Sequence, residues 1–554
     1  MYRPTDRQVP LLSAGVGLPE EARERLRSSW AGPFQEHVLP VLLVCEDDFA
    51  ALYSSGRGRP SWSIARRLGI CLLQEMFDLT DQRALDAVSF DARWQYALGM
   101  APGEAYLSRR SLVDFRSRMV RADPEMRLLR RVFERLRDAQ LEDLKVRTEL
   151  QRMDSTFVVS NIRKRGRTGL FSQTLEVFVR DLQRHRAEAF AQLSEPLRAW
   201  AEARAKKRDW FGDHGSASPL QQLAEWLVEA WQAFADDEDV SSWESYELVA
   251  RLVEEQLKLV PSGPDDCEGE GDGDGDEEPR SAHEPVEVVV RRKPQNNGTS
   301  LQTPHDPDAT YGRKGTGYSV QVVETCHNED QPEVITDFEV TGANENDWRK
   351  TTPALERLRG DNHLPDTLFV DGGYPSGPAL LDARALGVDL HGPAPRLRLP
   401  KDAVGRDEFE YDDEGQIVAC PQGHAPIREG HRRIQHVDEP VRHVYFDRKV
   451  CAACPLVERC VTRAGKTSHR RLEDRPSLRA RDEALARQRD PAWWKTYSIR
   501  AGIEATNSEL KRAHGLGKLR VRRGPRVRLA VTNKITACNT KRWLRSRQRA
   551  SRRG

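Results

Sequence analysis

Apolar residues recur at helical spacing in the first part of the chain. Between residues 61 and 76 they fall on one stripe, which consists of Ile64, Leu68, Cys71, Leu72 and Met76. This spacing predicts a helix with one buried face. A second helix is expected over 82–98, because Thr80 and the Asp that follows it can cap its start. A third is expected over 108–120, with arginines on its polar side. We therefore predict a helical DNA-binding domain over 1–130, although small bundles that only pack are as common.

Further along, the pattern changes to short runs rich in β-branched and aromatic residues. The run "MDSTFVVS", which contains Asp154, predicts a strand within residues 145–162. Similar runs alternate with helical segments in residues 300–395, and they lie at 317–325, 333–341 and 366–374. This order of strands and helices predicts an α/β fold with a mixed sheet.

Three segments separate or follow the parts of this predicted core. Residues 163–260 have helical periodicity and predict a long helical insert. Residues 261–299 include nine acids in a stretch without a base, and so little apolar surface predicts a disordered acidic linker. Residues 396–485 contain four cysteines and predict a small cysteine-rich insert. Residues 486–554 predict a core helix followed by a basic tail.

The net charge of the chain is only +1, but the charges are distributed unevenly. From Arg500 to Gly554 there are 17 Lys and Arg against two acids, Glu504 and Glu509. A tail of this density favours a polyanionic partner such as nucleic acid over a merely solvated terminus. There is no apolar run of membrane-spanning length, and the first residues lack the apolar core of a signal peptide. We therefore expect a cytoplasmic protein with no membrane contact.

Two carboxylates belong to apolar strands, and a third follows on a helix. Asp154 lies within one predicted strand, and Asp371 ends another in "LFVDGGY", where two Gly allow a ligand to approach closely. Charged groups inside strands are costly unless they are paired or bind a metal. Together with Glu504, these hard oxygen donors suit Mg²⁺ or Mn²⁺, and two such ions can promote phosphodiester displacement. The alternative is local, with Asp154 capping a turn, Asp371 beginning a turn and Glu504 pairing with Arg500.

Several of these motifs together resemble the bacterial insertion-sequence DDE transposases. "MDSTFVVS", "LFVDGGY" and the spacing YxxRxxxExxxxxxK are similar to the three signatures of that family. The last is similar to the YREK signature, and its residues here are Tyr497, Arg500, Glu504 and Lys511. The N-terminal helical region resembles the InsH-type domain, and "CPQGHAP" with "CxxCP" resembles a subgroup with a cysteine-bearing insert. The resemblance covers most of residues 40–545 but fades over the helical insert and the acidic linker.

The resemblance implies a ribonuclease-H-like core that cleaves and transfers DNA strands with two Mg²⁺ or Mn²⁺ ions. Asp154, Asp371 and Glu504 would then be the catalytic, metal-binding carboxylates. Arg500 and Lys511 lie near enough to Glu504 to contact DNA phosphates, and Tyr497 could stack or hydrogen-bond near the scissile strand.

The expected partners are double-stranded DNA with the terminal inverted repeats of the element, and target DNA. The resemblance also implies a homodimer when active. Without a membrane or signal segment, we expect the protein in the cytoplasm, associated with the nucleoid. Basic residues of the tail are candidates for phosphate contacts, namely Arg520, Arg522 and Arg523. Two alternatives remain, a nuclease on the same core without strand transfer and a non-catalytic zinc-containing DNA-binding protein.

Four cysteines in the predicted insert suggest a metal site. Cys451 and Cys454 have the CxxC spacing that directs two thiolates at one ion. Cys420 and Cys460 could complete a tetrahedral Zn²⁺ site, with His424 as a substitute for one of the thiolates. Such a site would be closed and structural, and free buried thiols are the alternative.

Overall fold

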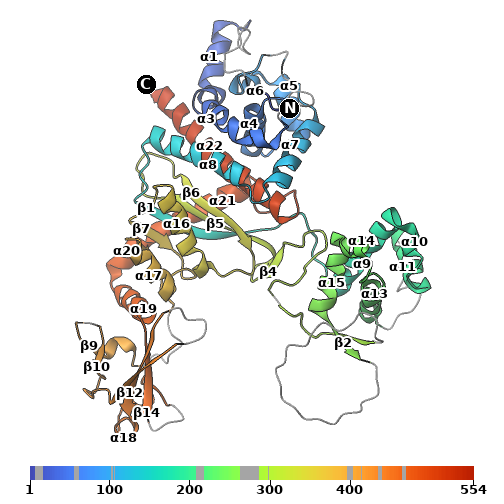
Figure 1. Ribbon diagram of the computed structural model, residues 1–554. Helices are drawn as coiled ribbons and strands as arrows, with labels where there is room; N and C mark the ends of the chain where they lie inside the picture. Colours follow the sequence, from blue (N-terminus) through green and yellow to red (C-terminus); the bar gives the residue numbers. More distant parts are fainter. Residues whose placement is uncertain are drawn as a thin grey trace.

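The computed structural model describes residues 1–5, 17–54, 61–101, 104, 106–206, 218–261, 286–296, 298–395, 404–413, 415–433, 439–464 and 469–553. The chain forms a helical N-terminal region, a central mixed sheet and two inserts that project from the sheet (Figure 1). The acidic stretch predicted to be a disordered linker lies largely outside the described residues, since 262–285 are not described.

The N-terminal region is helical throughout its described part. Ser63 and Thr80 cap two of the helices through side-chain oxygens that accept the N–H groups of Arg66 and Arg83, so the expected cap at Thr80 is confirmed. The elements are α1 (Glu20–Ser28), α2 (Ala31–Pro33), η1 (Phe34–Val38), α3 (Leu39–Cys45), η2 (Glu46–Leu52), α4 (Ile64–Met76), α5 (Asp81–Phe90), α6 (Ala92–Ala97), α7 (Arg109–Ala122) and α8 (Arg127–Leu144).

The central sheet is mixed, which confirms the predicted α/β class. Strand β1 runs antiparallel to β5 on one side and parallel to β7 on the other, and β7 runs parallel to β8. Both β4 and β6 pair with β5, so the order is β4 or β6, then β5, β1, β7 and β8. The strands are β1 (Leu150–Val158), β4 (Thr310–Gly312), β5 (Gly315–Thr325), β6 (Ile335–Gly342), β7 (Thr367–Val370) and β8 (Asp389–His391).

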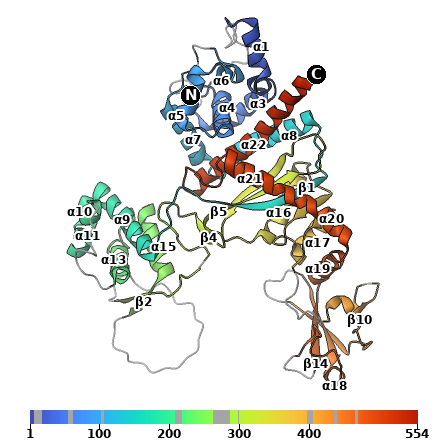
Figure 2. The same cartoon turned by 180° about the vertical axis from the view of Figure 1, so that it is seen from behind.

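Helices cover both faces of this sheet (Figures 1 and 2). On one face, Met153 and Val370 pack with residues of α16 (Thr351–Gly360), α17 (Gly377–Ala385) and α19 (Pro476–Arg487). On the other face, Val322 packs with residues of α21 (Ile503–Ala513) and α22 (Gly524–Arg553). Because strand residues alternate between faces, Asp154 points away from the face that buries Met153.

Between residues 167 and 256 the described residues are mainly helical, within the range predicted as a helical insert, and they have their own core around Phe171 and Trp200. After these helices, β2 (Leu257–Pro261) pairs antiparallel with β3 (Val286–Val290) in a two-stranded sheet, which we did not predict. The helices of this insert are α9 (Arg167–His185), α10 (Ala187–Phe190), α11 (Glu195–Ala205), α13 (Pro219–Ala233), α14 (Glu238–Ser241) and α15 (Glu244–Gln256).

The cysteine-rich insert is a small β structure that projects from the sheet beyond α19 (Figure 1). Four of its strands pair in the order β11, β12, β14, β13, around Val444, Phe446 and Leu472. The elements are η5 (Arg406–Glu408), β9 (Glu410–Tyr411), β10 (Ile417–Ala419), β11 (Arg428–Arg432), β12 (Val441–Asp447), α18 (Arg448–Ala452), β13 (Arg463–Ala464) and β14 (His469–Asp474).

The chain returns from this insert to the sheet through α19, α20 (Pro491–Tyr497) and η6 (Ser498–Gly502), and then enters α21. The predicted basic tail is mostly one 30-residue helix, α22. Its buried residues Leu529, Ala537, Trp543 and Leu544 belong to the core of the N-terminal region. None of the helices in the described ranges combines the length and the apolar character needed to span a bilayer.

Candidate active site

Asp154 lies in the middle of β1, opposite Val322 of β5. Its side chain is almost completely buried on the face covered by α21, where Asn507 Nδ2 donates a hydrogen bond to Oδ2 at 3.0 Å. Burial raises the pKa of the Asp154 carboxyl to about 6, although the Arg500 guanidinium opposes this rise. The sequence therefore places an acid where its charge has a desolvation cost that nearby partners must offset.

Asp371 follows the last residue of β7, at the carboxyl end of a strand parallel to β1. The backbone N–H of Gly373 donates to its Oδ1 at 2.8 Å. A Cβ on Gly373 would lie 3.1 Å from this oxygen, so the second Gly of "DGG" allows the tight turn that fixes the carboxylate.

Glu504 lies in the first turn of α21, and one guanidinium links it to both aspartates. Arg500 Nη1 is 3.1 Å from Glu504 Oε1, while Nη2 is 3.0 Å from Asp154 Oδ1 and 3.9 Å from Asp371 Oδ2. Residues separated by 217 and 133 positions along the sequence are thus brought around one side chain. The local alternative that Glu504 pairs with Arg500 also holds, but the pair belongs to this larger cluster.

A buried arginine on β1 holds the helix that carries Glu504 against the sheet. Arg152 Nε pairs with Glu324 of β5 at 2.8 Å, and its Nη1 donates to the carbonyl of Ile499 at 3.0 Å. A Cβ on Gly502 would lie 1.9 Å from that same Nη1. A side chain at position 502 would therefore displace the Arg152 guanidinium from its present contacts, so glycine lets the backbone before Glu504 pass close over Arg152.

Of the remaining YREK residues, Lys511 lines the cavity that holds the acids, whereas Tyr497 belongs to an aromatic stack on α20. Tyr497 stacks on Trp493, with ring centroids 5.2 Å apart, and Trp493 stacks on His391 at 4.5 Å. Lys511 is exposed, and no ion pair holds it in the described part of the chain.

The acids lie in an open cavity of about 880 Å³ that also includes residues the sequence reasoning missed. Asn507 lies in it with its Oδ1 buried and without a hydrogen-bond partner among the described residues. Glu345 and Asp347 are two further carboxylates that line it, and Asp347 Oδ1 accepts from the buried Gln321 at 3.0 Å. Asn507 lies one turn after Glu504, so its helical spacing could have suggested it, whereas Asp347 has no comparable signal.

The tail arginines expected to contact DNA are bonded to other parts of the protein. Arg520 pairs with Asp78 at 3.2 Å, and Arg523 pairs with Glu244 at 2.8 Å. Arg522 Nε donates to the carbonyl of Asn161 at 2.5 Å. All three side chains remain exposed, but they connect the segment before α22 to the N-terminal region, the end of β1 and the helical insert.

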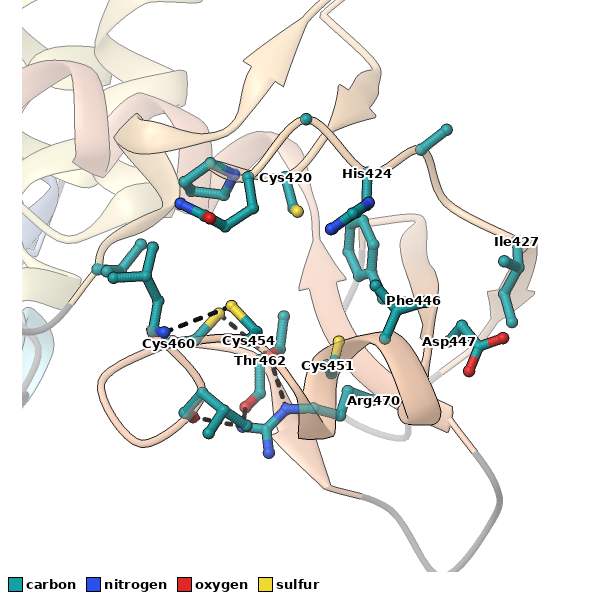
Figure 3. A pocket seen from close by; sticks show the side chains of 18 residues that line it. Cys420, His424, Ile427, Phe446, Asp447, Cys451, Cys454, Cys460, Thr462 and Arg470 are labelled. Carbon is teal, nitrogen blue, oxygen red and sulfur yellow. Dashed lines mark hydrogen bonds between the residues drawn. The ribbon is translucent and has the colours of Figure 1, made fainter.

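The cysteines of the insert line a separate cavity of about 300 Å³ (Figure 3). Cys420, Cys451, Cys454 and Cys460 reach it from three chain segments, and His424 lies on its wall. The N–H of Leu456 donates to Cys454 Sγ at 3.4 Å, and the Thr462 hydroxyl donates to Cys460 Sγ at 3.2 Å. All four thiols are free, and burial raises the pKa of the Cys451 thiol.

A buried polar cluster near the end of α21 was not predicted. Potential ligand atoms of Glu509, His514 and Cys538 lie within 4.8 Å of one another. Glu509 is already neutralised, because Arg542 Nη2 lies 2.8 Å from it. The ring of His514 bonds to the carbonyl of Glu75 in α4 at 3.1 Å, so the cluster joins α21 to the N-terminal region.

Two comparisons with protein families bear on this arrangement. Residues 419–544, which include the four cysteines and Glu504, match a family model described as a transposase DDE domain. Residues 35–118 in the N-terminal region match a model described as a transposase domain (DUF772). No curated protein and no solved structure matches the chain.

Proposed function

We propose that in this chain, a DDE transposase of the insertion-sequence type, Asp154, Asp371 and Glu504 are the carboxylates that carry out DNA cleavage and strand transfer. The observation that carries the assignment is their convergence on Arg500, at 3.0, 3.9 and 3.1 Å. Three carboxylates from two strands and one helix meet in an open cavity large enough to admit a phosphodiester.

Enzymes of this class use divalent metal ions, and the donor atoms here fit Mg²⁺ or Mn²⁺. The site offers carboxylate oxygens together with the unpartnered amide oxygen of Asn507, all of them hard ligands. We propose that two ions are held by Asp154, Asp371 and Glu504. When bound, such ions activate an attacking oxygen and stabilise a leaving one.

The reaction consists of two displacements at phosphorus. In the first, a water oxygen attacks the phosphodiester at an element end and the 3′-oxygen leaves as a hydroxyl. In the second, that hydroxyl attacks a phosphodiester of target DNA and displaces its 3′-oxygen. We propose that Arg500 and Lys511 hold non-bridging phosphate oxygens beside the acids, and that Tyr497 contacts the scissile strand through its exposed edge.

The cysteines support a proposal of structural Zn²⁺. Four thiols from three segments face one cavity, and sulfur is the preferred zinc ligand in closed sites. Among the described residues, no three of these sulfur atoms lie within 4.8 Å of one another, so we propose that binding draws them together.

The transposase function implies DNA as partner. We propose that the DNA consists of the terminal inverted repeats and the target site, that the active form is a homodimer, and that the protein associates with the nucleoid. Measuring the mass of the protein with and without a duplex that carries an element end tests the dimer, because a DNA complex that contains only one protomer would contradict it.

The acid assignment is tested by changing charge without changing shape. Asp154→Asn, Asp371→Asn and Glu504→Gln should each abolish cleavage while DNA binding persists. Glu483→Gln, which alters an exposed surface ion pair with Arg384, is the matched control and should cleave normally. Near-normal cleavage by any of the three variants would remove that residue from the site. Cleavage without joining on the same end duplex would favour a plain nuclease instead.

A further inference from the structure

The hairpin formed by β4 and β5 ends in two cations. Gly312 pairs with Gly315, so Arg313 and Lys314 are the two residues of a tight turn. Both side chains are exposed, and both line the same cavity as Asp154, Asp371 and Glu504. The tip thus presents positive charge to a cavity whose floor is acidic.

The hairpin is fixed against the loop that follows β6. A Cβ on Gly312 would lie 1.8 Å from the carbonyl oxygen of Ala343, so the two backbones are in direct contact. The N–H of Asn344 donates to Thr310 Oγ1 at 3.3 Å, and the N–H of Tyr311 donates to the carbonyl of Gly298 at 3.3 Å. Because both sides of the hairpin are anchored, its turn has a defined position relative to the sheet.

The charges at the tip are available to a ligand. No ion pair holds Arg313 or Lys314 anywhere in the described ranges, whereas Arg520 and Arg523 of the basic tail are each paired with a carboxylate. Lys164 adds a further cation, since its Nζ lies 3.5 Å from the position of a Cβ on Gly315. A row of unneutralised cations beside an acidic site suits a ligand that is itself a row of anions.

We propose that the β4–β5 hairpin binds the phosphate backbone of the DNA strand whose scissile phosphate lies at the three acids. This inference rests on the proposed function, because the acids define where the strand is cut. Asp154 is opposite Val322, seven residues along β5 from Gly315. At about 3.3 Å per residue, Gly315, where the strand meets the turn, lies at most roughly 23 Å from this point along the strand. At about 3.4 Å per phosphate, the contact falls within roughly seven nucleotides of the scissile phosphate.

The test compares two Arg–Lys pairs of equal charge. Arg313→Ala with Lys314→Ala removes the tip, and Arg448→Ala with Lys449→Ala removes an exposed pair on α18, at the far end of the cysteine-rich insert (Figure 1). Each is measured by salt titration on an end duplex and on an unrelated duplex. For two lost phosphate contacts, the log–log slope of the tip variant should flatten by about 1.8 on both duplexes. Between 50 and 200 mM salt, it should therefore lose about tenfold less affinity than the wild type.

The position of the contact on the DNA is found by combining the tip variant with duplexes that lack the charge of one phosphate. Duplexes with one neutral methylphosphonate, placed at each of the first seven positions from the cleavage site, should weaken wild-type binding at one or two positions and leave the tip variant unaffected there. The proposal would be overturned if the salt dependence of binding by the tip variant equalled that of the wild type. It would also be overturned if, at every position, the affinity lost through the methylphosphonate simply added to the affinity lost through the substitutions. Normal cleavage of the end duplex by Asp154→Asn would instead overturn the proposed site, so the two failures are distinguishable. If the salt dependence of binding changed by the same amount in the α18 variant, the effect would come from total charge and not from the position of the hairpin. This result would also overturn the proposal.

Discussion

Arg500 and Asp154 form an ion pair in the cavity that also holds Asp371 and Glu504, with Nη2 3.0 Å from Oδ1. The same guanidinium also contacts Glu504 and Asp371. Three carboxylates in one cavity repel one another, and Asp154 has the additional cost of burial. The single cation of Arg500 offsets both effects in the metal-free protein.

Replacing Arg500 by Ala should therefore destabilise the metal-free protein by about 1–3 kcal/mol, because it leaves the buried Asp154 charge without its cation. Added Mg²⁺ should then raise the melting temperature more in the variant than in the wild type, since the metal supplies the missing positive charge. Thermal unfolding with and without Mg²⁺ measures both effects.

Arg384→Ala is the control for this experiment. Its ion pair with Glu483 is exposed at both partners, and such pairs contribute little. If Mg²⁺ raised the melting temperature of wild type and Arg500→Ala equally, then Arg500 would not be taking the place of the metal among the three carboxylates.

The cysteines of the insert lead to an expectation about metal content. The purified protein should contain Zn²⁺ after desalting, and Cys451→Ser with Cys454→Ser should lose it, because the hydroxyl is a poor zinc ligand. Elemental analysis measures the metal, and proteolysis of residues 404–474 measures how tightly the insert is folded.

Serine substitution of Cys326, which is buried in the core far from the insert in sequence, provides the comparison. Equal zinc in both variants, or full protease resistance of the insert in metal-free wild type, would make the cysteine cluster incidental.

The tail arginines have two separable roles to test. The triple variant Arg520→Ala, Arg522→Ala and Arg523→Ala should flatten the salt dependence on all duplexes if these residues contact phosphates. It should also lower the melting temperature, because each side chain bonds to another part of the protein. A lower melting temperature with an unchanged salt slope would assign the three arginines to internal contacts alone.

The strands and their acids could be predicted because local chemistry specifies them. β-Branched runs identified β1 and β7, and an Asp in such a run is conspicuous since burial is costly. The fixed offsets among Tyr497, Arg500, Glu504 and Lys511 identified the third acid through the resemblance. These signals lie within short stretches of sequence.

Contacts between distant segments gave no such signal. Nothing near Gly502 indicates that Arg152 passes beneath it, and nothing in the tail indicates that Arg520 meets Asp78. The charge count of the tail could not separate paired from unpaired cations, because pairing depends on which acids the fold brings near. The free cations at the β4–β5 turn were overlooked for the same reason.

His514 should make stability depend on pH. Burial lowers the pKa of its ring to about 4 from an ordinary value of 6.5. Between these two pH values the unfolded chain binds a proton that the folded protein does not bind, so stability falls as the pH falls from 6.5 to 4. The loss attributable to this side chain is about 3 kcal/mol.

Denaturant unfolding of wild type and His514→Gln gives the free energy of unfolding at each pH between 7 and 4. The loss due to His514 is the difference between the two proteins in how steeply this free energy falls with falling pH. His431→Gln, at an exposed position on β11, should leave the slope unchanged. Parallel curves for wild type and His514→Gln would show that the ring is protonated in the folded protein.

The placement of α22 has a mechanical consequence. This helix is about 45 Å long at 1.5 Å per residue, and over the same turns it buries some side chains in the core of the N-terminal region and others in the core that includes the sheet. A helix that packs into two cores at once couples them rigidly. Under the proposed function, any rotation of the N-terminal helices on DNA would therefore be passed directly to the sheet and its acids.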